Sequence, residues 1–172
     1  MENDNDLSST VVAKSDQLNA DDLIEPITIT VTRVDKVSAK DQPVHIHSVG
    51  IQPYKPCLTM RRMLIAAWGK YKDEWVGRSM VVFCDPEVMW AGKEQGGVRV
   101  SHVSNIEGPV SKMLAVTRGR KKLFTLLPLE MDHSSIIEKY KAIESKEEKV
   151  NLWNTLNQQQ KSAIQEAYNG ER

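Results

Sequence analysis

The chain has 172 residues, of which 40% are hydrophobic and 27% are charged, and its formal net charge is zero. This composition excludes a wholly disordered chain, and no apolar run approaches the roughly 18 residues of a membrane span. Residues 1–25 hold one basic and seven acidic side chains, residues 26–129 hold sixteen and eight, and residues 130–172 hold six and eight. A basic middle between acidic flanks suggests a domain that meets a polyanion, although basic residues on a solvated surface are the alternative.

The first third of the chain predicts a tail followed by two strands. Residues 1–17 are rich in Ser, Asp and Asn, which is typical of a disordered acidic tail. Strict alternation predicts a strand over 27–34, and a second strand over 43–49 is expected to pair with it as a hairpin. Residues 53–57 contain two prolines, which cannot donate to a ladder, so we expect an extended segment at a sheet edge.

The middle third predicts one helix and several short strands. Apolar spacing over 60–70 predicts a helix that Thr59 caps and that Gly69 ends. Five further segments have strand patterns, the first of them continuously apolar: 79–84, 88–90, 98–103, 112–118 and 122–127.

The last third predicts helices. Ser134 and Ser135 can cap a helix from 136 to about 145, and residues 147–169 predict a helix pair or one broken helix. Residues 130–172 are therefore expected to form a helical appendage. We expect residues 18–129 to form an OB-like small β-barrel with one embedded helix, a mainly β (α+β) fold, with an SH3-like barrel or an open α+β sheet as alternatives.

Two basic clusters are candidates for contact with phosphate. Lys55, Arg61 and Arg62 surround a strand-to-helix corner, and the two arginines lie in a first helical turn, where the helix dipole disfavours cations. The second cluster is the basic turn 118–122, whose four cations repel one another unless an anion is present; a solvated turn is the alternative. The full expected set of phosphate-binding residues is Lys55, Arg61, Arg62, Arg78, Arg99, Arg118, Arg120, Lys121 and Lys122.

Aromatic residues near these cations could stack on unpaired bases. We expect Tyr54, Trp75 and Trp90 to offer such surfaces. Trp68 continues the apolar face of its helix, so we expect it in the core.

Signatures of enzymes are absent from the sequence: it has no P-loop, no dinucleotide-binding glycine pattern and no zinc-protease motif. We therefore expect a non-enzymatic protein without cofactor or metal. His45 and His47 have a spacing that can chelate zinc, but structural histidines explain it better. A magnesium-dependent nuclease using Asp85, Glu87 and Glu94 is a minor alternative.

A set of short motifs resembles those of small, mostly uncharacterised bacteriophage and prophage proteins, over residues 18–129. The resemblance implies single-stranded DNA binding or a role in recombination, in the cytoplasm of a bacterial host. The chain departs from the group at Leu58, where a lysine is expected, and it has no acidic tail tipped by an aromatic residue. The motifs are Leu18-Asn-Ala-Asp-Asp-Leu-Ile24, Pro53-Tyr-Lys-Pro-Cys57, Met60-Arg-Arg62, Trp68-Gly69, Val76-Gly-Arg78, Asp85-Pro86 and Gly96-Gly-Val-Arg-Val-Ser-His102.

The leading hypothesis is a non-enzymatic protein that binds single-stranded DNA in phage replication or recombination, with recombination proteins of host or phage as further partners. The acidic tail would compete with DNA within the molecule. Residues 130–172, with Trp153 and Leu156, are expected to serve oligomerisation or docking. The alternative is a phage protein-binding module that inhibits a host nuclease or defence enzyme. The first residues lack the order of a secretory signal, and two cysteines outside any CxxC, Cys57 and Cys84, fit a reducing cytoplasm.

Overall fold

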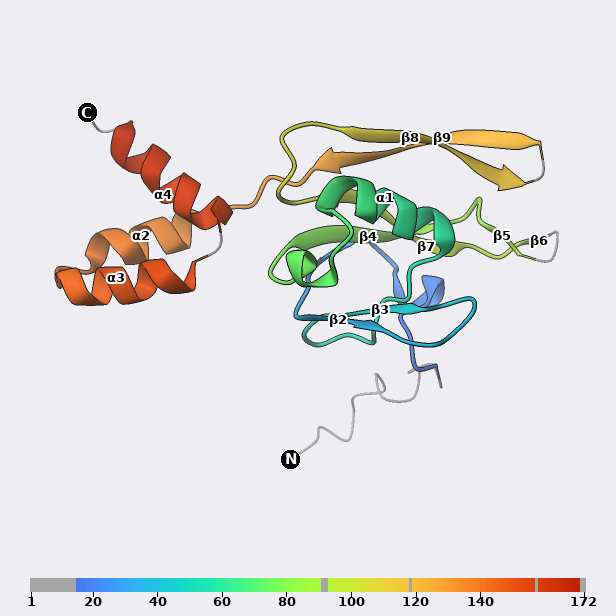
Figure 1. The fold of residues 1–172 in the computed structure, drawn as a ribbon, viewed down its shortest axis with the longest axis horizontal. Helices are drawn as coiled ribbons and strands as arrows, with labels where there is room; N and C mark the ends of the chain where they lie inside the picture. The colour runs from blue at the N-terminus through green and yellow to red at the C-terminus, as the bar shows by residue number, and fades with distance from the viewer. Residues whose placement is uncertain (1–14, 91–92, 118, 157, 171–172) are drawn as a thin grey trace. The chain divides into compact units, whose positions relative to one another are not determined.

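The computed structural model describes residues 15–90, 93–117, 119–156 and 158–170 (Figure 1). The chain divides between Leu129 and Glu130 into two compact units, which we call the sheet unit and the helical unit. Most of the expected acidic tail, residues 1–14, lies outside the described residues. Its last residues contact the sheet unit, because the Asp16 carboxylate meets Lys55 and the Gln17 side chain accepts a hydrogen bond from Gln42.

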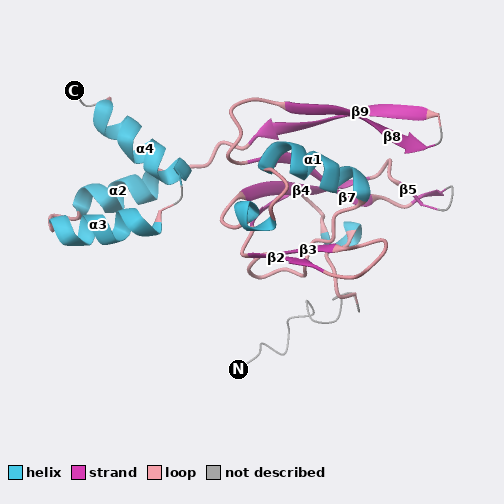
Figure 2. Ribbon diagram, viewed as in Figure 1, coloured by secondary structure: helices cyan, strands magenta, loops and turns pink. Residues whose placement is uncertain are grey.

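The sheet unit contains one five-stranded sheet, two small two-stranded sheets and a single α-helix among its described residues (Figure 2). In the large sheet only β7 and β9 run parallel. Its strands, in spatial order, are β1 (Ile27–Thr30), β4 (Ser79–Asp85), β7 (Gly97–Val103), β9 (Arg120–Pro128) and β8 (Val110–Thr117). The small sheets pair β2 (Arg33–Lys36) with β3 (Val44–His47) and β5 (Met89–Trp90) with β6 (Lys93–Glu94). The helix is α1 (Leu58–Trp68), and short 3₁₀ turns cover η2 (Ala20–Asp22) and η3 (Lys72–Trp75).

The expected mixture of strands and helices is confirmed, but the expected closed barrel is not. The large sheet is open in the part of the chain that the structure describes, with β1 and β8 at its two edges. Closure needs a pairing between these edges. β1 is only four residues long, and the chain beyond it turns away to pair with β3, so no strand continues towards β8.

The alternating run 27–34 serves two sheets where the sequence predicts one strand. β1 pairs with β4, and after Thr32, whose amide donates to the His47 carbonyl at 2.9 Å, β2 pairs with β3. The change of partner explains why Ile29 and Val31 are buried as expected while Val34, of the opposite parity, is buried too. The hairpin expected between the strands 27–34 and 43–49 is confirmed, and it is formed by β2 and β3.

α1 begins two residues earlier than the expected cap, Thr59, implies. Cys57, in extended conformation, is the N-cap, and its carbonyl accepts the first helical hydrogen bond from the amide of Arg61 at 2.9 Å. Thr59 therefore lies inside the helix. Gly69 ends it as expected: its φ of +92° is a conformation that glycine adopts without steric cost.

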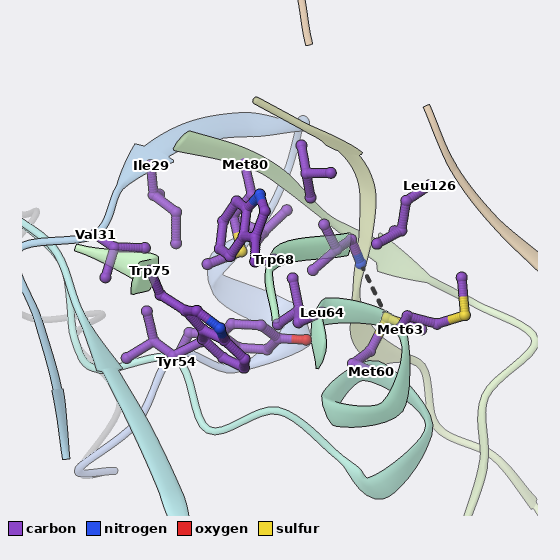
Figure 3. Packing of buried hydrophobic residues seen from close by; sticks show 14 of the residues in the cluster. Ile29, Val31, Tyr54, Met60, Met63, Leu64, Trp68, Trp75, Met80 and Leu126 are labelled. Atoms are coloured by element: carbon purple, nitrogen blue, oxygen red, sulfur yellow. Dashed lines mark hydrogen bonds between the residues drawn. The ribbon is translucent and has the colours of Figure 1, made fainter. Parts of the chain in front are cut away.

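The core lies between α1 and the sheet and includes the aromatic rings in Figure 3. α1 contributes Met60, Met63, Leu64 and Trp68, and it packs against β7, β8 and β9 (Figure 1). The expected core position of Trp68 is confirmed, and its indole nitrogen donates to the Ser104 carbonyl at 2.8 Å. The core thus fixes the start of α1 against the middle of the sheet.

The helical unit consists of α2 (Ser134–Ala142), α3 (Lys146–Thr155) and α4 (Gln158–Asn169). Of the two alternatives for residues 147–169, the helix pair is correct. Ser145 caps α3 by accepting from the amide of Glu148 at 3.5 Å. Ser134 is inside α2 instead of capping it, and its amide donates to the Asp132 carboxylate at 2.8 Å. No described helix has both the length and the hydropathy needed to cross a membrane.

Candidate nucleic-acid interface

The large sheet opens between β7 and β9. These strands are hydrogen-bonded only near their last residues, where His102 is opposite Leu127 and Val103 is opposite Pro128. Earlier in β7 the amide of Val100 donates instead to the thioether sulfur of Met60 in α1, at 3.4 Å. The start of α1 therefore fills part of the gap that the two separating strands leave.

A cleft of about 300 Å³ lies at this opening, and we call it the strand-gap cleft. Its walls combine apolar rings and side chains with Asp85, Arg99 and Lys122. It is lined by Met60 of α1, by Phe83 and Asp85 of β4, by Arg99, Val100 and Ser101 of β7, and by Lys122, Leu123, Phe124, Thr125 and Leu127 of β9.

Arg99 is the central cation of this region. Its guanidinium donates from Nη1 to the Cys57 sulfur at 2.7 Å, and its Cζ lies 5.9 Å from the centre of the Phe124 ring. Asp85 faces it, with Oδ2 at 3.7 Å from Nε, which is too long for a hydrogen bond. The side chain is only 13% exposed, and its buried Nε has no hydrogen-bond partner among the described residues. An unsatisfied buried donor on a cation favours an anionic acceptor.

Arg99 also lines a second cleft, of about 430 Å³, which we call the tail cleft. Lys55 and Cys57 lie in it together with residues 17–21, which follow the expected tail. Lys55 Nζ donates to the Asp16 carboxylate at 2.7 Å. Because of this hydrogen bond and the charge of Lys55, the pKa of Asp16 lies below its usual value. The structure thus brings Lys55, Arg99 and Lys122 together around the start of α1.

Lys122 lies at the rim of the strand-gap cleft and is paired as well. Its Nζ donates to the Glu87 carboxylate at 2.9 Å, and this hydrogen bond, with the charge of Lys122, lowers the pKa of Glu87. Both side chains are largely exposed to water, with Glu87 at 73%. Exposed ion pairs of this kind contribute little to stability, so a phosphate can replace the carboxylate at small cost.

The remaining predicted cations are distributed more widely. Arg61 donates to the backbone carbonyl of Asp41 at 3.1 Å, while Arg62 is exposed on α1. Arg120 and Lys121 are exposed at the start of β9. The expected turn between two strands is therefore present but shorter than 118–122, because Gly119 is in a turn with a φ of +82° and the strand begins at Arg120. Arg78 is held near the other end of α1, with its guanidinium 5.9 Å from the Trp68 ring centre, so it does not join the cluster.

Two of the three expected stacking residues are in the core. Tyr54 is buried, and its hydroxyl donates to the Val98 carbonyl at 3.4 Å; burial raises its pKa. Trp75 is also buried, and its indole nitrogen donates to the Gly69 carbonyl at 3.0 Å. Their rings pack against neighbours and offer no face to a base, so the stacking prediction is wrong for both. Arg118 and the side chain of Trp90 lie outside the described residues.

Two of the three carboxylates of the nuclease alternative face cations, Asp85 facing Arg99 and Glu87 pairing with Lys122, while Glu94 is exposed in β6. His47 hydrogen-bonds Asp35 at 2.9 Å. In the parts of the chain that the structure covers, no group of three or more His, Cys, Asp or Glu side chains could hold a metal ion.

Most residues that line the two clefts are outside the predicted site set, among them Cys57, Ser101 and Phe124. The sequence offered a weak signal for Phe124, an aromatic residue two positions after the basic segment. Nothing in the sequence connects Cys57 with Arg99, because that contact depends on α1 packing onto β7. Comparisons of the chain with protein-family models, with curated proteins and with solved structures find no match.

Proposed function

We propose that this protein is a non-enzymatic binder of single-stranded DNA and that the sheet unit holds the strand at the strand-gap and tail clefts. The observation that carries the proposal is the meeting of Lys55, Arg99 and Lys122 at the start of α1, with the buried Nε of Arg99 lacking an acceptor. Phosphate oxygens are acceptors of the kind that such cations bind.

The exposed strand β9 extends this cationic region. Arg120 and Lys121 add two cations beside Lys122. The Phe124 ring lines the strand-gap cleft and is half-buried, so it takes the role that Tyr54 and Trp75 cannot fill. Stacking on such a ring tolerates any base, which fits binding without sequence preference.

The acidic residues near the clefts support regulation within the molecule. Asp16, at the end of the acidic segment, is 88% exposed and occupies Lys55. A phosphodiester that displaces this carboxylate would give the Lys55 ammonium an acceptor of the same single negative charge. By this proposal the acidic segment competes with DNA and limits weak binding. The resemblance to phage proteins supports a role in phage replication or recombination in a bacterial cytoplasm. By this proposal the open sheet binds single-stranded DNA as an OB fold does.

A fluorescence-anisotropy titration at several ionic strengths tests the proposal, with single-stranded DNA, duplex DNA and RNA oligonucleotides. If about four to six phosphates are neutralised, log affinity falls with log salt at a slope near −3 to −4. Changing both Lys121→Ala and Lys122→Ala should make that slope less negative by about 1.4.

The matched control is Lys72→Ala, which removes one exposed cation from η3 beyond the far end of α1. It should leave the affinity and the slope nearly unchanged. An affinity that does not change with salt concentration contradicts the proposal. So does a Lys72→Ala variant whose salt slope changes, per charge removed, as much as that of the double variant. Duplex DNA bound more tightly than the single strand contradicts it as well.

A further inference from the structure

The helical unit gathers three aromatic rings, one from each of its helices. Tyr140 of α2 lies 5.7 Å from Trp153 of α3 and 6.2 Å from Tyr168 of α4, measured between ring centres. The first pair is tilted by 54° and the second is edge to face at 89°. The rings therefore present faces in different directions, which is unlike a closed stack.

These rings surround a cleft of about 530 Å³, which we call the aromatic cleft. The volume lies within the range of about 300–1,000 Å³ that small-molecule sites occupy. Tyr168 remains 40% exposed, although the described core residues of the unit, Leu156 and Ile164, are buried. The cleft is lined by Tyr140, Lys149, Trp153, Ile164, Gln165, Tyr168 and Asn169.

Each of the three rings also has a lysine ammonium near its face. Lys149 Nζ is 5.7 Å from the centre of the Tyr140 ring, Lys161 Nζ is 5.8 Å from that of Trp153, and Lys141 Nζ is 5.8 Å from that of Tyr168. Residues 130–172 carry more acidic than basic side chains, yet none of the described residues that line the cleft is acidic. Of the three lysines, Lys149 also lines the cleft itself.

We propose that the aromatic cleft binds an unpaired nucleobase, with its lysines on the flanking phosphates. The ligand must combine a flat apolar face with negative charge, because the walls combine three aromatic rings, of which Tyr168 is exposed, with the ammonium group of Lys149. A nucleotide has both features, and base stacking on aromatic rings is stronger than an exposed contact between an ammonium and a ring. This inference goes beyond the proposed site in the sheet unit and rests on the proposed function for the class of ligand.

The test uses the full chain and an oligothymidylate of about eight nucleotides, with an RNA oligonucleotide as a second arm. Tyr168→Ala should weaken binding about five- to a hundredfold, the range expected for one lost stacking contact, while Tyr168→Phe should bind like the wild type. The RNA arm shows whether the cleft discriminates between the two sugars.

The matched control is Tyr71→Ala. Tyr71 is a 60% exposed tyrosine of the sheet unit with Lys70 Nζ 5.1 Å from its ring centre, but it lines none of the clefts described above. Its loss should leave the affinity unchanged. Equal weakening by Tyr71→Ala and Tyr168→Ala contradicts a special role for the aromatic cleft.

Tryptophan fluorescence gives a readout that does not depend on a truncated side chain. The oligonucleotide should quench the fluorescence of Trp153, because a base bound in the aromatic cleft lies next to the indole ring. Trp153→Phe should remove this contribution to the quenching. Trp68 and Trp75 are buried in the sheet unit and report little of this contact. Quenching that persists unchanged in Trp153→Phe overturns the inference, as does an unchanged affinity of Tyr168→Ala.

The same measurements separate the two proposals. The sheet-unit site alone is rejected if the Lys121→Ala, Lys122→Ala double variant keeps the wild-type affinity and salt slope while the oligonucleotide still quenches Trp153. Binding that depends on the two lysines without quenching Trp153 would reject the aromatic cleft alone. A chain that binds neither oligonucleotide rejects both, and a protein ligand would then be the better explanation for the cleft.

Discussion

The cations at the start of α1 each face an acid. Lys55 pairs with Asp16, Arg99 faces Asp85, and Lys122 pairs with Glu87. The Asp16 and Glu87 carboxylates are largely exposed to water, whereas the Lys55 side chain is only 7% exposed. Screening therefore keeps the pair of Lys122 and Glu87 weak, because both of its side chains are exposed. In the structure the two lysine ammonium groups are therefore positioned by carboxylates, which a phosphate would have to displace under the proposed function.

Replacing the competing acid should strengthen DNA binding. Glu87→Gln removes the charge that occupies Lys122 and leaves a side chain of similar shape. We expect the affinity for single-stranded DNA to rise about two- to fivefold, the range that corresponds to one weak surface ion pair. Fluorescence anisotropy at low salt measures the change.

Two controls separate the pairing from the general loss of negative charge. In a Lys122→Ala background the effect of Glu87→Gln on the affinity should vanish, because this variant has no ion pair between the two positions. Glu94→Gln removes an exposed acid from β6. If Glu94→Gln raises the affinity as much as Glu87→Gln, the ion pair is not the cause.

The contact between Asp16 and Lys55 should be visible in the titration of the carboxyl group. Lys55 holds the pKa of Asp16 below its usual value of 3.8. Since the folded pKa is lowered, the pair stabilises the folded state above pH 3.8, and this contribution is lost as the pH falls through the folded pKa. In Lys55→Met the pKa of Asp16 should rise towards 3.8, as carboxyl carbon shifts measured by NMR would show.

Glu87 provides the internal reference in that experiment. Its pKa is lowered by Lys122, a different partner, so Lys55→Met should not move it. An Asp16 titration that is the same in both proteins would mean that the acidic segment does not occupy Lys55 in solution. The proposed competition between this segment and DNA would then lose its support.

At the scale of elements, α1 connects the core with the clefts. Leu64 is fully buried between the helix and the sheet, while its neighbour Ile65 is 46% exposed. We expect Leu64→Ala to lower the free energy of unfolding by about 2–5 kcal/mol, because a cavity remains where the side chain packed. Ile65→Ala, in the same helix, should change it by no more than about 0.5 kcal/mol.

Urea unfolding followed by circular dichroism measures both changes, with the midpoint and the slope compared between variants. If the two substitutions cost the same, α1 does not use the Leu64 face to pack on the sheet. The start of α1 would then have no fixed position against β7, and the contact between Arg99 and Cys57 would need another explanation.

The sequence predicted the elements better than their partners. Alternation identified the run 27–34 as extended, but nothing local marks Thr32 as the place where pairing passes from β4 to β3. Tyr54, between prolines and beside a lysine, was a candidate stacking surface and is buried, because β3 and β7 lie beside it in the fold. For the candidate site, the excess of basic residues in the middle of the chain could be predicted from the sequence. The pairing of Lys55 with Asp16 could not, because the two residues are 39 positions apart and meet only in the folded chain.

At the scale of the whole molecule, the chain carries two units with separate interiors. The buried residues of the sheet-unit core all lie between Leu18 and Leu126, and none comes from the helical unit. Among described residues, the three rings of the helical unit contact one another, and the buried Ile164 lines the same cleft. Each unit therefore has its own source of stability.

The chain cut after Leu129 should consequently fold as a cooperative unit. Trp68 and Trp75 keep their packing and hydrogen bonds without the helical unit, so the near-ultraviolet circular dichroism that they dominate should persist. Single-stranded DNA should still bind, with the salt dependence set by the sheet unit and an affinity lowered about as far as Tyr168→Ala lowers it in the full chain. If the fragment folds but does not bind DNA, the binding site must lie in residues 130–172. The cations around Arg99 would keep their positions in such a fragment and would still not bind a strand.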